Sequence, residues 1–359
     1  MHTQKVDTII IGGGLSGVYA AYLLAAKKKS LTLLEARSRL GGRILSPEHQ
    51  VFFADLGPSW YWPAINPKIN SLIKTLGLKG YPQFDIGQAR FQTKDGYAQT
   101  VDGYPMEPPG WRLSQGMISL VKGLCAQIPE QVIQLNHPVC EIQRLDNGVG
   151  VIVGRHDQAP KCRIEASQMI LALPPRLAAC SILFTPDLSY DLTQAMLKAS
   201  TWMAGHAKFF ALYEKADWRK VGLSGQGFSL CGPLGEIHDG SDQGEGLCGL
   251  TGFVGIPALR RKNKEIMIQN ILAQLPRLFG EGAGCPARVY YEDWAKKEFT
   301  ASEYDLRSAH NHPEFLPPLG RTSIWNHRLH FAGTETADHL SGYLEGALSS
   351  AERAVSAAI

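Results

Sequence analysis

The chain has 359 residues, of which 44% are apolar and 19% are charged, and its formal net charge at pH 7 is +3. This composition is typical of a globular protein and excludes large-scale disorder, and the length allows two modest cores, so we expect two domains. The small net charge and the lack of any run of five or more basic residues argue against a nucleic-acid-binding protein.

The seven cysteines are scattered, odd in number and without a C-x-x-C pair. This pattern argues against a disulfide framework or a zinc site and fits a reducing compartment. The sequence has no stretch of about 18 apolar residues that could span a membrane. The apolar run at residues 9–11 ends in glycines and is too short for a signal peptide. We therefore expect a soluble, cytoplasmic protein without a metal.

The first 35 residues predict a strand, a glycine turn, a helix and a second strand. Residues 6–11 are rich in β-branched side chains, as in a buried parallel strand. Residues 16–26 are apolar on all faces, as in a helix packed between a sheet and a partner, and residues 31–34 repeat the strand pattern. A further helix is expected over residues 69–76, because Gly77 follows it.

The rest of the chain alternates between sheet and helix. Residues 81–110 are short alternating pieces around Asp95-Gly96 and Asp102-Gly103, which predict hairpins of an antiparallel sheet. Further strands are expected within residues 132–153 (two strands) and at residues 169–173, 208–214, 228–231, 247–254, 288–292 and 329–332. Further helices are expected over residues 114–127 and 264–279 and from about residue 343 to the end.

This order of elements predicts an α/β fold. One domain would be doubly wound and Rossmann-like, interrupted by excursions into a second domain made of an antiparallel sheet and helices. We assign residues 1–75, 114–183 and 318–359 to the nucleotide-binding domain, and residues 76–113 and 184–317 to the substrate domain.

The turn after the first strand satisfies G-x-G-x-x-G and leads directly into a helix. Gly12 permits the tight turn, Gly14 lets the backbone approach a pyrophosphate, and Gly17 lets helix and strand pack closely. The phosphates would lie on free N–H groups at the positive end of the helix, beside Ser16. Glu35 ends the second strand at the distance where an acid binds ribose hydroxyls. Together these residues predict a dinucleotide site.

The residues that follow Glu35 favour FAD over NAD. They add a second glycine pair, Gly41-Gly42, and three arginines that include Arg37 and Arg43. Planar guanidinium groups suit phosphates, and glycines allow another close approach of the backbone. A nicotinamide enzyme has no need of this second cradle, so we expect FAD, with Arg37, Gly42 and Arg43 among its contacts.

On these residues the sequence resembles the flavin amine oxidase family, which includes monoamine oxidases, polyamine oxidases and L-amino-acid oxidases. The resemblance runs through residues 9–43 and includes DLGPSW at residues 55–60. It returns as FAGTET at residues 331–336 and SGYLEGA at residues 341–347, a pairing found in few other families. The middle of the chain resembles the family only in scattered pieces.

The resemblance implies where FAD binds. Glu335 would lie against the ribityl and phosphate portion. The backbone of Leu344, at the start of the last helix, would face the flavin pyrimidine carbonyl, where helix N–H groups stabilise negative charge on the ring. The other residues expected at the cofactor are Gly57, Pro58, Ser59, Trp60, Val139 and Gly333.

The resemblance also implies catalytic residues. Two aromatic rings sandwich the amine in this family, and Tyr343 and Tyr304 stand at the matching positions. A lysine near the start of a strand reaches flavin N5 through a water, and Lys208 matches it, although such a lysine is also commonly a solvated strand end. Monoamine oxidases bond the flavin to a cysteine just before the second tyrosine. Glu303 stands there in this chain, so we expect FAD to be held non-covalently.

We therefore expect an FAD-dependent oxidoreductase that oxidises a small amine. A hydride would pass from the α C–H bond to flavin N5, the imine would leave and hydrolyse, and O2 or another acceptor would reoxidise the flavin. The alternatives are a flavin desaturase acting on C–C bonds, as in protoporphyrinogen oxidases and carotenoid desaturases, and a catalytically decayed flavoprotein that serves as a binding subunit.

Two further expectations concern the substrate region. Between Trp60 and Arg112 there is room for one helix and a hairpin, where larger family members place much of their substrate domain, so we expect a shallower, more open site. The histidines at 206, 310 and 312 are expected to be superficial or structural, because hydride transfer from a neutral amine needs no histidine base.

Overall fold

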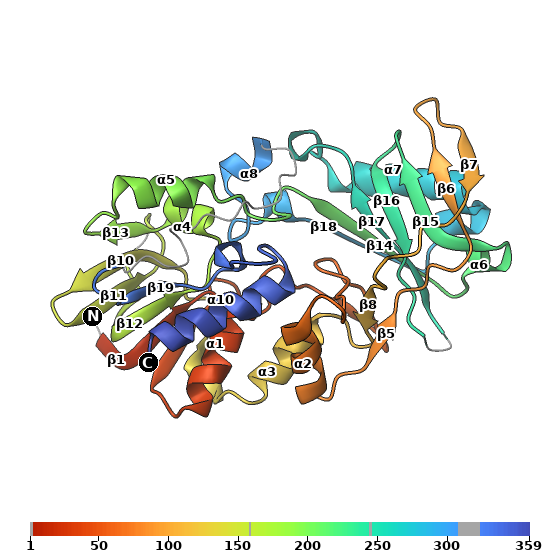
Figure 1. Cartoon of the computed structure of the whole chain (residues 1–359). Helices are drawn as coiled ribbons and strands as arrows, with labels where there is room; N and C mark the ends of the chain where they lie inside the picture. The colour runs from red at the N-terminus through yellow and green to blue at the C-terminus, as the bar shows by residue number, and fades with distance from the viewer. Residues whose placement is uncertain (1–2, 158, 244–245, 308–323) are drawn as a thin grey trace.

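The computed structural model describes residues 3–157, 159–243, 246–307 and 324–359 (Figure 1). The molecule is elongated, with one large sheet toward each end, and both chain termini lie beside the first sheet (Figure 1). His310, His312 and the expected domain boundary at residues 317–318 lie outside the described residues. Within the described residues, no helix combines the length and the apolar content that crossing a membrane requires.

The first sheet is built mainly from parallel strands, as the βαβ pattern predicts. Its order is β13-β10-β11-β12-β1-β2-β9, and β19 pairs with β12. β1 pairs in parallel with β2 and β12, and β12 pairs in parallel with β19, whereas the β10·β11 and β11·β12 pairs are antiparallel. The strands are β1 (Thr3–Ile11), β2 (Leu31–Leu34), β9 (Ile133–Gln134), β10 (Val139–Leu145), β11 (Gly148–Val153), β12 (Cys162–Leu171), β13 (Leu183–Thr185) and β19 (Leu329–Phe331).

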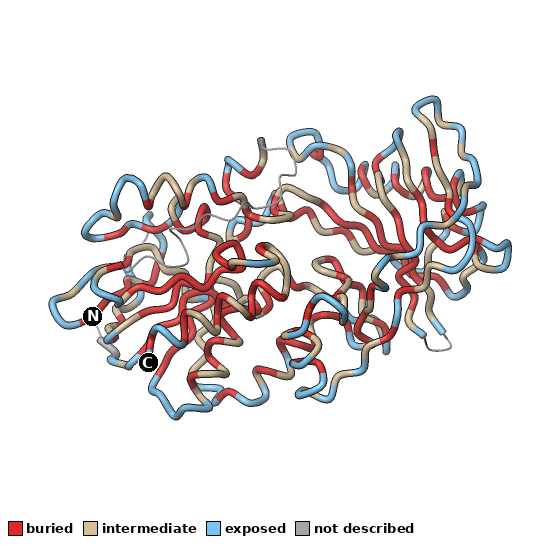
Figure 2. Tube along the Cα trace, in the orientation of Figure 1, coloured by how far each residue is buried: buried red, intermediate tan, exposed pale blue. Residues whose placement is uncertain are grey.

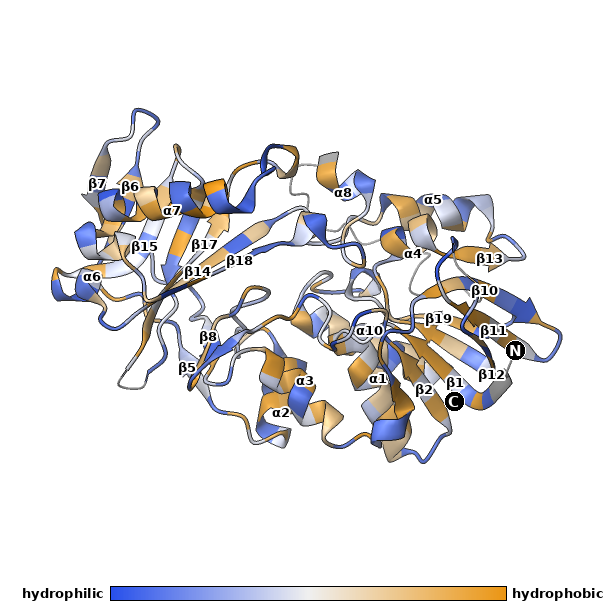
Figure 3. Ribbon diagram, turned by 180° about the vertical axis from the view of Figure 1, so that it is seen from behind, coloured by the Kyte–Doolittle hydropathy of each residue, from blue (hydrophilic) through white to orange (hydrophobic). Residues whose placement is uncertain are grey.

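Both faces of this sheet are covered, which is why its strands are continuous apolar runs. Ile10 points into a core shared with α1 (Leu15–Ala26), α2 (Pro67–Thr75), α3 (Ile118–Cys125) and α10 (Leu344–Ala357). Ile9 and Ile11 point the other way, into a core that includes α4 (Pro175–Ser181) and α5 (Tyr190–Lys198). Buried backbone fills the centre of both sheets, and apolar residues gather on the strands of the first (Figures 2 and 3). The doubly wound α/β prediction is confirmed.

The second sheet has the order β18-β14-β17-β16-β15-β6-β7. Its pairs are antiparallel except β15·β6, which is parallel, so the expected antiparallel sheet is in fact mixed at this position. The strands are β6 (Gln88–Gln92), β7 (Ala98–Val101), β14 (Ala207–Tyr213), β15 (Leu223–Ser229), β16 (Leu234–Asp239), β17 (Cys248–Val254) and β18 (Arg288–Asp293).

The two faces of β14 have different partners. Phe209 and Ala211 pack with Leu275 of α7 (Lys264–Phe279), which covers the outer face of the sheet. Phe210 and Leu212 pack on the opposite face, against residues of the first part of the chain. The remaining short elements are β3 (Glu48–His49), β4 (Phe52–Phe53), β5 (Gly80–Pro82), β8 (Trp111–Leu113), α6 (Asp217–Lys220), α8 (Glu303–Arg307) and the 3-10 turns η1 (Glu130–Val132), η2 (Ala258–Arg260), η3 (Glu281–Gly284), η4 (Trp294–Lys296) and η5 (Thr334–Thr336).

Other features of the fold also differ from the sequence expectations. β16 is a strand of the second sheet although no strand was predicted there, because its Gly235, Glu236, His238 and Asp239 resemble a polar loop. β13 and α5 pack with the first sheet and its core. We therefore propose that the first domain extends to about residue 199, instead of ending at residue 183.

Candidate active site

Two glycine turns lie against each other where β1 ends. Gly12 has a φ of +107°, and a Cβ there would lie 2.6 Å from the carbonyl oxygen of Ala172. A Cβ on Gly17 would lie 1.9 Å from the carbonyl oxygen of Gly12, so only glycine lets α1 begin this close to the strand. Gly14 is the N-cap of α1, and the nearest atom to a Cβ placed on it is the Cα of Gly42, at 3.9 Å. This is a backbone cradle at a helix N-terminus, a place that favours an anion such as a phosphate.

The two ends of the chain meet at this cradle. Ser16 Oγ, in the first turn of α1, donates to the carbonyl oxygen of Ala332 just after β19. The next residue, Gly333, approaches the backbone so closely that a Cβ would lie 2.2 Å from the carbonyl oxygen of Leu173. The N-terminal and C-terminal motifs therefore border one site at the carboxyl edge of the parallel strands, where open α/β sheets bind ligands.

Glu35 is buried at the end of β2 beside the first glycine turn. Its Oε2 accepts from the N–H of Gly13 at 2.7 Å and its Oε1 from the N–H of Arg37 at 2.8 Å. A carboxylate offers about four acceptor positions, so hydroxyl donors can still bind it. The guanidinium of Arg37 donates to Thr300 Oγ1 at 2.6 Å and lies over the ring of Phe299. Arg37 thus connects the segment after β2 to residues 299–300.

An ion pair joins the second glycine turn to the C-terminal motif. Arg43 Nη1 lies 2.6 Å from Glu335 Oε1, and the Glu335 side chain is completely buried. Arg43 Nη1 also donates to the carbonyl oxygen of Trp202 at 3.0 Å, and the N–H of Trp202 donates to Glu335 Oε1 at 3.3 Å. Three segments far apart in the sequence are fixed to one another by these contacts.

The last helix points its N-terminus at the same region. α10 begins at Leu344 after the N-cap residue Tyr343. The carboxylate of Glu345 is already used, because it accepts from the N–H groups of Lys68 and Ile69 at 2.9 and 3.0 Å and so caps α2. The first N–H groups of a helix have no partner inside it, so the dipole of α10 favours an electron-rich ligand group here.

Lys208 of β14 is buried at the junction of the two sheets. Its Nζ donates to the carbonyl oxygen of Gly57 at 2.7 Å and to Ser59 Oγ, and it lies 5.4 Å from the ring of Trp60 and 5.0 Å from that of Phe253. Burial lowers the pKa of this lysine from 10.5 to about 7. With 3% of its surface exposed, Lys208 is no solvated strand end, and that interpretation is wrong.

Strand register places further groups on the same face as Lys208. Lys208 lies opposite Phe253 of β17, Phe253 opposite Glu236 of β16, and Glu236 opposite Phe228 of β15. Glu236 Oε1 lies 2.6 Å from His238 Nε2. This hydrogen bond is the largest cause of the lowered pKa of Glu236. The face thus combines a lysine that can lose its proton with two aromatic rings and a carboxylate.

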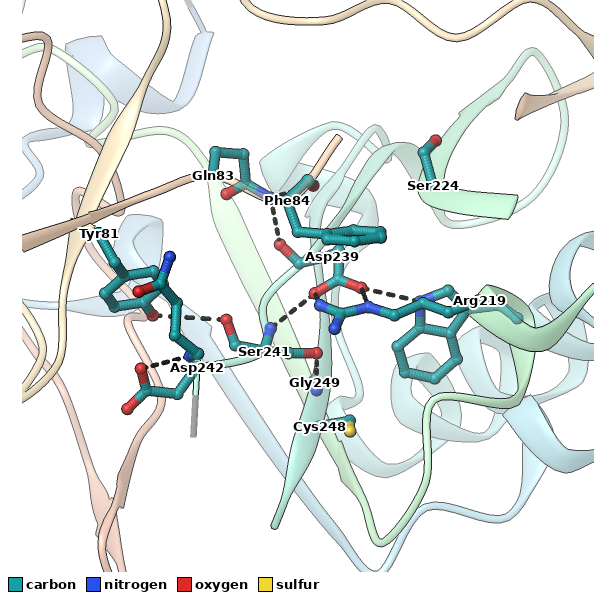
Figure 4. A network of polar contacts seen from close by, with 12 residues as sticks. Tyr81, Gln83, Phe84, Arg219, Ser224, Asp239, Ser241, Asp242, Cys248 and Gly249 are labelled. Atoms are coloured by element: carbon teal, nitrogen blue, oxygen red, sulfur yellow. Dashed lines mark hydrogen bonds and ion pairs between the residues drawn. The ribbon is translucent and has the colours of Figure 1, made fainter. Parts of the chain in front are cut away.

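The indole of Trp60 is held against this face. Trp60 Nε1 donates to Gln83 Oε1 at 2.6 Å, and the ring lies edge-on to His238 at a centroid distance of 5.0 Å. Gln83 Nε2 donates to the carbonyl oxygen of Asp239 at 2.7 Å (Figure 4). A chain of hydrogen bonds therefore connects the orientation of Trp60 to β16.

The carboxylate of Asp239 sits at the centre of a buried network (Figure 4). It accepts from Arg219 Nε and Nη2, both at 2.8 Å, from Trp218 Nε1 at 2.9 Å and from the N–H of Ser241 at 2.8 Å. The guanidinium of Arg219 also lies 3.7 Å from the centroid of the Phe84 ring. Trp218 and Arg219 therefore fix the framework behind Trp60.

The segment from Asp55 to Trp60 links the two halves of the molecule. Asp55 is buried, which raises its pKa, and accepts from Ser46 Oγ at 2.5 Å and from the N–H of Met117 at 3.0 Å. The next residue, Leu56, accepts at its carbonyl oxygen from Trp294 Nε1 at 2.9 Å. Gly57 and Ser59 then accept the hydrogen bonds of Lys208 Nζ described above. Their side of the site is therefore anchored by residues of both halves of the molecule.

For three predicted residues, Tyr304, Val139 and Pro58, the structure shows no contact that assigns a role. Tyr304 lies on α8 with 57% of its surface exposed. Val139, at the start of β10, lies opposite Val153 of β11 and is half-buried. Pro58 is half-buried between Gly57 and Ser59. Their roles at the cofactor or substrate stay predictions.

Some residues of the site were not found in the sequence. Phe253, Glu236 and His238 come together only through the register of three strands, one of which was missed. Trp202, in the loop before β14, has a ring 6.3 Å from that of Tyr343. No local motif marks it, because its main-chain contacts go to residues 159 and 133 positions away.

The residues fit FAD on the geometry of the site itself. Gly12, Gly14 and Gly42 bring two backbone turns together at the N-terminus of α1, where a pyrophosphate gains most from N–H groups. Glu35 retains acceptor positions that suit hydroxyl donors, and the N-terminus of α10 has a positive dipole that suits an electron-rich ligand group. All seven cysteines are free thiols.

Comparisons with known proteins agree with this geometry. A family model described as flavin containing amine oxidoreductase matches residues 106–359, and one described as an NAD(P)-binding Rossmann-like domain matches residues 10–76. The chain is 23% identical to a probable flavin-containing monoamine oxidase A of Dictyostelium discoideum, over 97% of this chain and 96% of that protein. It is 23% identical to a putrescine oxidase of Kocuria rosea, over 85% and 86% of the two chains. A solved structure of wild-type putrescine oxidase bound to putrescine superposes with a TM-score of 0.82 at 21% identity, covering 99% of both chains.

Proposed function

Because this chain belongs to the flavin-containing amine oxidoreductase family and is an FAD-dependent oxidoreductase, we propose that it oxidises a small amine at the α-carbon. The observation that carries the proposal is Lys208, a buried lysine of the second sheet that is held by Gly57 and Ser59 beside the rings of Trp60 and Phe253. The relatives include monoamine oxidases and a putrescine oxidase, which supports an amine as the substrate.

The N-terminal glycine turns, Glu35, Arg43, Glu335 and the start of α10 would hold the FAD. When bound, the flavin supplies the acceptor for a hydride. We propose that it is held without a covalent bond, because the residue before Tyr304 is Glu303, which offers no thiol. The ion pair of Arg43 and Glu335 would fix the segments that enclose the phosphates and the ribityl chain.

The residues of the second sheet would prepare the amine. An alkylammonium ion has no lone pair and must lose a proton before its α C–H bond can leave as a hydride. Lys208, with a pKa of about 7, is substantially neutral at physiological pH and can take that proton at Nζ. Glu236 would attract the incoming cation, and Trp60 and Phe253 would exclude water from it.

The chemistry then balances. A neutral amine, R–CH2–NH2, that gives up a hydride from its α-carbon becomes an iminium ion, R–CH=NH2+. Water hydrolyses this ion to an aldehyde and ammonium. O2 or another acceptor would reoxidise the flavin.

Anaerobic bleaching of the flavin by a panel of amines tests the proposal. We expect alkylamines to reduce the wild-type protein at a rate that increases with pH through about 7, and Lys208→Met to be slower and to lose this pH dependence. Lys264→Met, an exposed lysine on α7, is the matched control and should behave as wild type. A protein that is bleached only by cyclic or polyene hydrocarbons, or by no reductant, would contradict amine oxidation.

A further inference from the structure

Lys208 has the hydrogen-bond partners of a neutral amine. Its Nζ donates to the carbonyl oxygen of Gly57 and to Ser59 Oγ, and no further acceptor bonds to it among the residues that the structure describes. A neutral amine has two N–H groups and a lone pair, whereas an ammonium ion has three N–H groups. The two acceptors therefore satisfy the neutral form, and its lone pair is left to take a proton.

Asp55 and Arg112 lie at the start of the same short segment. Asp55 is two residues before Gly57, and its Oδ2 lies 3.9 Å from Arg112 Nη2, which is too far for a hydrogen bond. Its Oδ1 is already used by Ser46 and Met117. Arg112 Nε and Nη1 are buried and have no hydrogen-bond partner in the described part of the chain. The positive charge of Arg112 is therefore only partly compensated.

The buried charges at this place do not balance when Lys208 is protonated. Asp55, Arg112 and Lys208 are all buried. An arginine keeps its proton in a protein, so a protonated Lys208 would give two cations and one anion in a region with little water to screen them. Loss of the proton from Lys208 removes the excess positive charge.

Two other carboxylates near Lys208 have partners of their own. Glu292 lies opposite Lys208 on β18, but Lys297 Nζ is 2.8 Å from its Oε1. Glu236 is bonded to His238, and 47% of its side chain is exposed, so water screens its charge. Neither carboxylate replaces the counter-charge that a protonated Lys208 would need.

The nearby charges act on Lys208 in opposite directions. Burial is the largest cause of its lowered pKa, the charge of Asp55 raises the pKa again, and the charge of Arg112 lowers it further. Tyr81 lies opposite Arg112 on β5, and burial raises the pKa of its phenol to about 12, so it adds no charge at physiological pH. Asp55 and Arg112 thus form an opposed pair beside the lysine.

We propose that Arg112 is a positioning residue for the reaction, since its partly compensated guanidinium opposes a proton on Lys208 while Asp55 limits that effect. The inference rests on the proposed function, in which Lys208 takes a proton from the alkylammonium ion. Arg112 acts only through Lys208 and needs no contact with the substrate or the flavin. The pair would set the pH at which the enzyme can prepare its substrate.

The protonation of Lys208 can be followed directly by NMR. Protein labelled with carbon-13 at the lysine Cε gives a signal that is absent in Lys208→Met, and its position reports the state of Nζ. In wild type we expect the midpoint at a pH of about 7. Arg112→Met leaves Asp55 as the counter-charge of Lys208, so the midpoint should increase by about one pH unit, whereas Asp55→Asn should decrease it by about one. Arg112→Lys keeps the charge and should stay close to wild type.

Flavin reduction by a saturating alkylamine provides a second measurement. A shift of about one pH unit makes the Arg112→Met protein about fivefold slower than wild type at pH 7, with similar rates at pH 9. Asp55→Asn should retain more of its own maximal rate at pH 6 than wild type does. A purely structural role would instead slow both variants equally at every pH.

Arg176→Met is the matched control, because it removes one partner of another buried pair, in which Arg176 Nη1 lies 2.7 Å from Asp305 Oδ1. It should leave the midpoint of Lys208 unchanged. The inference is overturned if Arg112→Met and Asp55→Asn both titrate like wild type, or if Arg176→Met shifts the midpoint as much. Should Arg112→Met not fold, the downward shift in Asp55→Asn still decides. Failure of the proposed function would appear differently, as shifted midpoints in a protein whose flavin no amine reduces.

Discussion

The glycine cradle at the first sheet and the face of the second sheet that carries Lys208, Phe253 and Glu236, our proposed substrate face, are built in different ways. The cradle depends on glycines and on contacts between backbones, and most of its residues lie in two short stretches at the ends of the chain. The substrate face depends on side chains brought together by the register of β14, β17, β16 and β15. A cradle of this kind tolerates little change, whereas a side-chain face can change gradually as the substrate changes.

The largest expected effect is in the cradle. Gly17→Ala would place a Cβ 1.9 Å from the carbonyl oxygen of Gly12, so either α1 or the turn must shift. We expect a protein that purifies without colour, measured as the ratio of flavin to protein. Gly235→Ala in the second sheet is the control, because its Cβ would meet nothing closer than 3.7 Å. A yellow Gly17→Ala protein would refute the rigid cradle.

The ion pair between the chain ends should have the next largest effect. Glu335→Gln leaves Arg43 without its buried counter-charge, and removing one partner of a buried pair costs roughly 3–5 kcal/mol. We expect FAD to bind about 100-fold more weakly, as measured by titration of the apoprotein. The control is Glu298→Gln, which breaks the exposed pair with Arg155 and should change FAD binding by less than about twofold.

The pH dependence of stability tests the junction between the two regions. Folding lowers the pKa of Lys208 from 10.5 to about 7, so between these values the unfolded chain binds more protons than the folded one. Stability from this group therefore increases with pH over that window, by at most about 1.4 kcal/mol per pH unit, and is unaffected below pH 7 and above 10.5. Urea unfolding at pH 7, 8 and 9 should show this increase in wild type relative to Lys208→Met. Parallel curves would mean that the lysine stays charged.

The smallest effect is expected on the substrate face. Glu236→Gln keeps a hydrogen-bond acceptor for His238 but removes the negative charge from the face that carries Lys208. We expect KM for alkylamines to increase about threefold at low salt, with kcat unchanged, and the difference to disappear at high salt. Glu265→Gln on α7 is the control. An unchanged KM would show that the charge of Glu236 does not reach the substrate.

The same contrast explains what could be predicted from the sequence. The turn at Gly12–Gly17 and the acid Glu35 are local signals, because a tight turn and a ribose contact each need particular residues at fixed spacing. Lys208 could be predicted as a candidate, but its burial could not, because that burial depends on Gly57 and Ser59, about 150 positions away. β16 was missed because its polar residues satisfy one another only in the folded network around Asp239.

The contacts between these distant segments have a consequence for the bound form. Ser16 is bonded to Ala332, Arg43 to Glu335, and α2 is capped by Glu345, so both segments must be in place for the site to be closed. A cofactor that binds only this closed arrangement stabilises it by mass action, so the supply of FAD would set how much of the protein is closed.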